Sequence, residues 1–204
     1  MKILIDNGHG ADTAGKRSPD GKLREWKYTR EIAVRVVDLL KAHGIDAEQL
    51  VSEERDIALS ERCNRVNDWC YELGRDNVLL ISIHLNAAGN GADWAKGRGW
   101  EAYTYVGQSE SDKVAEHLYA CAEEALSGMK IRRDWTDGDS DKETRYYILK
   151  YTKCAAVLTE NLFMDNREDY QFLLSEEGRS AIVHLHVAGI IDYLRAKKKS
   201  SQNR

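Results

Sequence analysis

Apolar residues follow two different periods along this chain, and the two periods alternate. Short, continuous apolar runs predict buried strands at residues 2–6, 78–83 and 155–159, with weaker strand patterns at 45–50, 100–106 and 146–149. Apolar residues that recur every three or four positions predict helices at 25–43, 57–73, 109–127, 166–175 and 177–196. Strands separated by helices favour an α/β fold. We therefore expect a single domain with a twisted, mostly parallel central sheet of about six strands and helices on both faces.

Polar segments interrupt this pattern at two loops and at the end of the chain. The loops 87–98 and 132–145 are poor in apolar residues. The second loop holds aspartates at positions 134, 137, 139 and 141, but it lacks the order of ligands found in an EF-hand, so we interpret it as a surface loop rather than a calcium site. The basic end, residues 197–204, predicts a frayed, disordered tail behind a folded domain of residues 1–196.

The composition excludes several classes of partner. A net charge of −4 offers no basic field for nucleic acid. No apolar run approaches the roughly 20 residues that a membrane-spanning helix needs. The four cysteines, Cys63, Cys70, Cys121 and Cys154, form no CxxC pair, and we interpret them as reduced core residues.

Side chains that bind metals follow the three strongest strand patterns. The runs ending at residues 6, 83 and 159 lead into Asn7-Gly8-His9-Gly10, His84 and Glu160, respectively. In an open α/β sheet, ligands bind in the crevice beyond the carboxyl ends of the strands. Two histidines and a glutamate that are distant in sequence should therefore converge there.

A catalytic zinc site uses three protein ligands and leaves one position open. His9 and His84 supply two candidates, and Glu25, at the start of the first predicted helix, can supply the third. Glu160 is then free to act as the general base that takes a proton from the attacking water and passes it to the leaving amine. This set of residues predicts hydrolysis of an amide or an ester.

Two other interpretations of these residues stay open. A single histidine after a strand is more often a structural residue than a ligand, so the hypothesis depends on the joint pattern. Two histidines and one carboxylate also describe the non-haem iron(II) triad, which is a different class of metalloenzyme.

The same residues lie in motifs that resemble the zinc-dependent N-acetylmuramoyl-L-alanine amidases of the amidase type 3 family, from about residue 2 to residue 194. Glu25 stands ahead of the first helix, as in that family. The matching motifs are at residues 5–10 (IDNGHG), 55–64 (RDIALSERCN), 82–87 (SIHLNA), 98–103 (RGWEAY), 147–150 (YILK) and 157–166 (VLTENLFMDN). The chain departs from the pattern at Asn7, where many relatives have proline, and at Lys150, where arginine is common.

The resemblance implies an amidase catalytic domain over residues 1–196, with His9, Glu25 and His84 as ligands of Zn²⁺. It implies that Glu160 is the catalytic carboxylate. The substrate would be peptidoglycan, cut at the amide between N-acetylmuramic acid and L-alanine of the stem peptide. We also expect three residues in the matching motifs to contact substrate, namely Asn86, Arg98 and Asn161. The alternative within the same fold is a non-catalytic wall-binding module.

The start of the chain bears on where such an enzyme would act. Met1 stands directly before the first predicted strand, and no secretory signal is visible. We therefore expect a protein made in the bacterial cytoplasm that reaches the cell wall by endolysin-like release, or a secreted enzyme whose leader is absent from this sequence. We expect a monomer that binds neither nucleic acid nor membrane.

Overall fold

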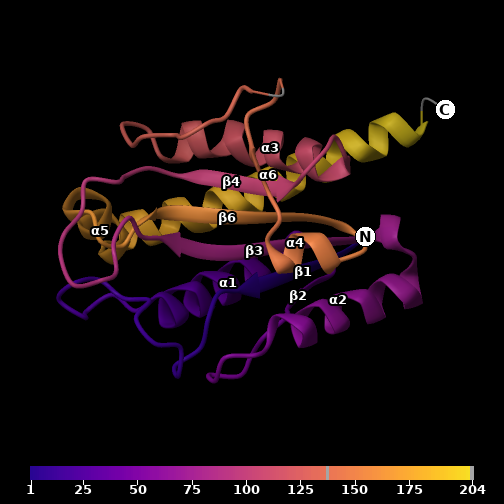
Figure 1. Cartoon of the computed structure of the whole chain (residues 1–204). Helices are drawn as coiled ribbons and strands as arrows, with labels where there is room; N and C mark the ends of the chain where they lie inside the picture. The colour runs from indigo at the N-terminus through magenta and orange to yellow at the C-terminus, as the bar shows by residue number, and fades with distance from the viewer. Residues whose placement is uncertain (137, 203–204) are drawn as a thin grey trace.

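The computed structural model describes residues 1–136 and 138–202. Within these residues one six-stranded sheet has the order β2-β1-β3-β6-β4-β5 (Figure 1). β1, β2, β3 and β6 run parallel to one another, whereas β4 is antiparallel to β6 and parallel to β5. The strands are β1 (Lys2–Asn7), β2 (Ala47–Gln49), β3 (Val78–Asn86), β4 (Glu101–Tyr105), β5 (Lys142–Thr144) and β6 (Ala155–Phe163).

Helices cover both faces of this sheet. α1, α3 and α6 pack on one face, where Ile3, Ile81 and Val157 belong to one core cluster. α2 and α4 lie on the other face, where Leu4 and Leu80 belong to a second cluster. The predicted α/β fold is therefore confirmed. The helices are α1 (Glu25–Ala42), α2 (Leu59–Leu73), α3 (Glu110–Ala125), α4 (Tyr147–Tyr151), α5 (Arg167–Leu174) and α6 (Glu176–Gln202), with a short 3₁₀ turn η1 (Arg75–Asn77).

Two core features follow directly from the apolar pattern. Neighbouring residues of β1 and β3 alternate between the two core clusters, because successive side chains of a strand point to opposite faces. Cys63 and Cys70 are buried in the second cluster, as expected of core residues, whereas Cys121 and Cys154 are only partly buried.

The predicted strand at residues 146–149 is wrong. This segment forms the short helix α4, in which the backbone amide of Lys150 donates to the carbonyl of Tyr146 over 2.9 Å. Ile148 and Leu149 are buried while Tyr147 and Tyr151 are exposed, a spacing that suits a helical turn. Short apolar runs cannot be assigned by periodicity alone, which explains the error.

The loop predicted at 132–145 is partly ordered as a strand. Lys142–Thr144 forms β5 at the edge of the sheet and pairs with β4. Three residues are too few to carry a recognisable alternation in sequence. Asp137, one of the aspartates noted in this segment, lies outside the described residues.

The last helix continues where the sequence led us to expect a frayed tail. α6 extends to Gln202, so residues 197–202 are helical. Lysine and glutamine are good helix formers. The ammonium of Lys197 also donates to the carbonyl of Asp76 and to the hydroxyl of Tyr193, both over 3.1 Å. Residues 203–204 lie outside the described residues. None of the described helices is both long and apolar enough for a membrane span.

A buried arginine joins α2 to the end of β1. The side chain of Arg62 is 2% exposed. Its guanidinium donates to the carboxylate of Asp6 and to the carbonyl of Asn7, each over 2.6 Å, and to the carbonyl of Ile57 over 2.8 Å. Asp6 is equally buried, so each charge of this pair depends on the other.

Replacing Arg62 by methionine should therefore lower the free energy of unfolding by about 3–5 kcal/mol, because Asp6 would remain buried without its counter-charge. Urea denaturation measures this loss. Arg65→Met is the matched control on the same helix, since the ion pairs of Arg65 with Glu53 and Glu61 are partly exposed and should contribute no more than about 1 kcal/mol. Equal losses in the two variants would contradict this account.

Candidate metal centre and active site

One face of the sheet changes from apolar to polar at the carboxyl ends of the parallel strands. Asp6 pairs in register with Ser82, and His84 pairs with Glu160. Further back on this face lie Leu80 on β3, four residues before His84, and Leu158 on β6, two residues before Glu160. Both are core residues under α2 and α4. Paired positions in neighbouring strands project from the same face, so His84 and Glu160 lie side by side at the end of a hydrophobic surface.

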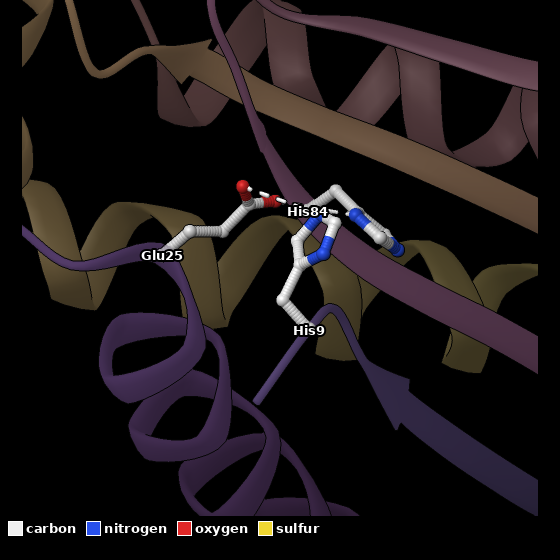
Figure 2. Close-up of side chains that lie close together, drawn as sticks. All are labelled: His9, Glu25 and His84. Carbon is white, nitrogen blue, oxygen red and sulfur yellow. Dashed lines mark hydrogen bonds and ion pairs between the residues drawn. The ribbon is translucent and has the colours of Figure 1, made fainter. Parts of the chain in front are cut away.

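The residue that follows β1 is held in an uncommon backbone conformation. His9 has φ of 62°, the left-handed region that costs a non-glycine residue about 1–3 kcal/mol. Its carbonyl accepts a hydrogen bond from Arg30 over 2.9 Å, and Arg62 approaches the same oxygen at 3.4 Å. These buried guanidinium groups hold the strained turn, which directs the His9 ring toward His84 (Figure 2).

Gly8 allows the two histidines to approach each other. A Cβ atom at Gly8 would lie 2.5 Å from Cε1 and Nδ1 of His84, a distance that real Cβ atoms do not adopt. The rings of His9 and His84 meet edge to face with their centroids 5.3 Å apart. Glycine is therefore required at this position for packing, not for its φ.

Glu25, the first residue of α1, extends its carboxylate to both of these histidines (Figure 2). It is 1% exposed, and its Oε1 accepts from the backbone amide of Leu85 over 3.0 Å and lies 3.2 Å from Nδ1 of His84. Its Oε2 lies 3.5 Å from Nε2 of His9 and has no hydrogen-bond partner. His9, Glu25 and His84 each offer a ligand atom within 4.8 Å of the others. A buried carboxylate oxygen without a partner, between two imidazoles, fits a bound metal cation.

The environment sets different charge states for these side chains. Burial lowers the pKa of His9 to about 4, although the charge of Glu25 opposes the change, so this ring is neutral and keeps a free lone pair. Burial also disfavours the charged form of His84, but its hydrogen bond with Glu25 raises its pKa above the ordinary value. Burial likewise opposes ionisation of Glu25, yet His84 holds the pKa of that carboxyl below its usual range. The carboxylate of Glu25 and the His84 ring therefore each favour the charged form of the other.

Glu160 is the carboxylate that stands apart from this cluster. Burial raises the pKa of Glu160 to about 8, while the charge of His84 acts in the opposite direction. Its Oε2 is buried and has no hydrogen-bond partner. A carboxyl whose pKa lies near neutrality is suited to move protons in a reaction.

Glu160, His9 and His84 open into one hollow of about 580 Å³. The wall opposite Glu160 is formed by the ends of α2 and α4, with Leu59, Tyr146 and Tyr147. All three of these side chains are more than 40% exposed. The sequence did not indicate this wall, because residues 146–149 were predicted to form a strand.

The structure places the three predicted substrate-binding residues away from this hollow. Asn161 is completely buried; it accepts from Trp100 Nε1 over 2.8 Å and donates to the carbonyl of His84 over 3.0 Å. Asn161 thus holds β3 at His84, and its contact with substrate stays a prediction. Arg98 pairs with Glu168 on α5, and Asn86 donates to Glu101 over 2.6 Å. For these two, substrate contact stays a prediction.

Glu101 is a charged residue beside the site whose role the sequence did not indicate. It pairs directly with Glu160 across β4 and β6 and is buried. Arg132 and Lys142 both bind its Oε2. These cations neutralise Glu101 beside the carboxylate of Glu160. Glu101 lies in the motif at 98–103, but that motif does not show its partners, which come from a different part of the chain.

Comparison with known proteins agrees with this geometry. The family model described as N-acetylmuramoyl-L-alanine amidase matches residues 3–192. N-acetylmuramoyl-L-alanine amidase CwlM of Bacillus licheniformis is 30% identical over 98% of this chain and 72% of its own length. The endolysin of Bacillus phage SPP1 is 25% identical over 97% of this chain and 68% of its own.

Solved structures give the same result. N-acetylmuramoyl-L-alanine amidase AmiC2 of Nostoc punctiforme superposes with a TM-score of 0.77 and 25% identity, covering 96% of this chain and 97% of that one. The catalytic domain of the CD27L endolysin gives a TM-score of 0.71 and 26% identity over 94% and 97% of the two chains. The fold and site thus define a cell-wall hydrolase. The chain belongs to the N-acetylmuramoyl-L-alanine amidase family and has the amidase activity of that family.

Replacing Gly8 by alanine should lower kcat/KM on peptidoglycan by roughly 10²-fold, because the added methyl group would displace the His84 ring and small displacements of catalytic groups have effects of this size. Release of soluble products from purified sacculi measures the change. Gly89→Ala is the matched control, since its nearest neighbour, Asp165 Oδ2, would lie 3.4 Å from the new Cβ. Normal activity in Gly8→Ala would show that the close packing at His84 has no role.

Proposed function

We propose that this chain is a zinc-dependent amidase that cuts peptidoglycan between N-acetylmuramic acid and L-alanine of the stem peptide. The observation that carries the proposal is the cluster of His9, Glu25 and His84, whose ligand atoms lie within 4.8 Å of one another next to Glu160. Two imidazoles and one carboxylate are a ligand set of catalytic zinc sites.

The three residues His9, Glu25 and His84 would hold the ion. Zinc in such a site supplies a Lewis acid, which polarises a carbonyl oxygen and favours the ionisation of water. The neutral ring of His9 and the carboxylate of Glu25 are already in the protonation states that ligands require. The His84 ring would release its proton on binding.

Glu160 would move the proton during hydrolysis. Its carboxylate takes a proton from the attacking water and delivers it to the amide nitrogen, so that the bond to L-alanine breaks with a neutral amine as leaving group. The raised pKa of Glu160 supports both steps, because such a group releases and accepts a proton near neutral pH. The exposed rings of Tyr146 and Tyr147 offer apolar surfaces on which a sugar or a peptide can lie.

The setting we propose is the bacterial cell wall. The phage SPP1 relative is named an endolysin, and the CwlM relative is named an amidase. An endolysin-like role fits both names. The iron(II) enzyme and the non-catalytic wall-binding module are the two alternatives that the experiments below separate.

Digestion of purified sacculi tests the bond that is cut. We expect free L-alanine amino termini on otherwise intact stem peptides, with no new reducing sugar ends, because the amide and not a glycosidic bond is hydrolysed. End-group labelling followed by mass spectrometry detects both products. Reducing ends without new L-alanine termini would contradict the assignment, and tight sacculus binding without cleavage would favour the wall-binding module.

Glu160→Gln should keep one bound zinc per chain, but its rate of hydrolysis should fall by about 10²–10⁴-fold, which is the usual contribution of a general base. His84→Ala should lose the zinc as well as the activity. Elemental analysis and activity on sacculi under anaerobic conditions give the two readouts, with the exposed Glu143→Gln as the control on the same sheet. Loss of zinc from Glu160→Gln would make Glu160 a ligand, and activity that required iron and oxygen would favour the iron enzyme.

A further inference from the structure

Three aspartates gather at the end of the sheet away from the catalytic hollow. Asp112 lies in the first turn of α3, while Asp139 and Asp141 precede β5. Each offers a carboxylate oxygen within 4.8 Å of the others. β4 runs antiparallel to β6, and its first residue, Glu101, pairs with Glu160. The later residues of β4 therefore lie toward the other end of the strands. Among them is Thr104, which donates to Asp141.

In each of these aspartates, one carboxylate oxygen accepts a hydrogen bond from a neighbouring residue. Asp112 caps α3 through the amide of Ser109. Gln108 Nε2 donates to Asp139 Oδ2, and Thr104 Oγ1 donates to Asp141 Oδ2, both over 2.6 Å. The second oxygens, Asp139 Oδ1 and Asp141 Oδ1, are buried and find no hydrogen-bond partner within residues 1–136 and 138–202.

Two of the three side chains are deeply buried, and among the described residues no cationic side chain pairs with them. Asp141 is 1% exposed and Asp112 is 6% exposed. In the part of the chain that the structure describes, none of the three forms an ion pair with lysine, arginine or histidine. Lys113 lines the adjoining hollow, but its ammonium binds Glu110 over 2.9 Å. The positive end of the α3 dipole offsets about half of one elementary charge, which leaves most of the negative charge uncompensated.

Burying several carboxylates together without a counter-charge is costly, and proteins usually resolve it with a proton or a cation. Burial, followed by the charges of Asp139 and Asp112, raises the pKa of Asp141 to about 7. A partly buried cluster of this kind can therefore hold one shared proton in the absence of a cation. The open hollow of about 400 Å³ beside Asp112 and Asp139 gives solvent and ions access to the cluster.

We propose that Asp112, Asp139 and Asp141 bind a calcium ion. Carboxylate oxygens are the ligands that this hard cation prefers, and Ca–O distances of about 2.3–2.6 Å allow ligands on opposite sides of the ion to lie about 5 Å apart. The spread of 4.8 Å within the cluster meets that limit. Asp141 is only 1% exposed, so its unpartnered Oδ1 is the atom that most needs such a partner. Water in the hollow would complete the coordination.

This proposal changes the interpretation of the segment 132–145, which the sequence alone led us to treat as a surface loop without a calcium site. The EF-hand order is absent because the third carboxylate, Asp112, comes from a different element. A bound ion would fasten α3 to the chain before β5. Lys142 directly follows Asp141 and binds Glu101, so the ion would also steady the cations beside Glu160.

Isothermal calorimetry of the full chain, with its catalytic site loaded with zinc beforehand, tests the site with CaCl₂ as the probe. We expect one calcium per chain and a rise in Tm on adding Ca²⁺ that NaCl of matched ionic strength does not reproduce. Asp141→Asn and Asp139→Asn should abolish both effects. Asp134→Asn, in the same segment but outside the cluster, is the matched control and should respond as the parent chain does.

The two substituted chains also distinguish a cation site from a shared proton. Removing one carboxylate relieves the repulsion, so Asp141→Asn should have a higher Tm than the parent chain when Ca²⁺ is absent. The proposal is overturned if Ca²⁺ neither binds nor raises Tm in the parent chain, or if Asp139→Asn and Asp141→Asn respond to Ca²⁺ as the parent does. Asp139 is less buried than Asp141, so its variant remains informative if Asp141→Asn does not fold.

Discussion

Two buried guanidinium groups hold the backbone at the end of β1, and the rest of the site depends on them. Arg62 from α2 and Arg30 from α1 both bind the carbonyl of His9, which keeps that residue in a left-handed conformation. α1 also begins with Glu25, so the helix that stabilises the turn delivers the carboxylate between the two histidines. Charge buried for structural reasons and charge used for chemistry are thus parts of one network.

The sheet supplies the second constraint. One face is apolar under α2 and α4 and becomes polar only in the last pairs of β1, β3 and β6. His84 and Glu160 are in register, so the candidate ligand and the candidate base keep a fixed separation without any loop between them. Two further residues support this arrangement. Asn161 donates to the carbonyl of His84, and Glu101 on β4 pairs with Glu160.

The sequence predicted the parts of this structure that local patterns encode. The α/β fold and the approach of His9, Glu25 and His84 followed from apolar runs, strand ends and a family resemblance. The strand at 100–106 was also predicted and is β4, but its antiparallel direction was not. The short strand β5 and the helix α4 were missed, because segments of three to five residues carry too little periodicity. The motif around Asn161 shows which residue stands beside Glu160 but not that its amide turns inward to the carbonyl of His84.

Anomalous diffraction at the zinc absorption edge, from crystals grown with equimolar zinc, tests the central claim most directly. The account predicts one strong peak bonded to His9, Glu25 and His84, with Glu160 facing it from beyond bonding distance. A peak bonded to Glu160 in place of Glu25, or no peak among these three residues, would contradict it.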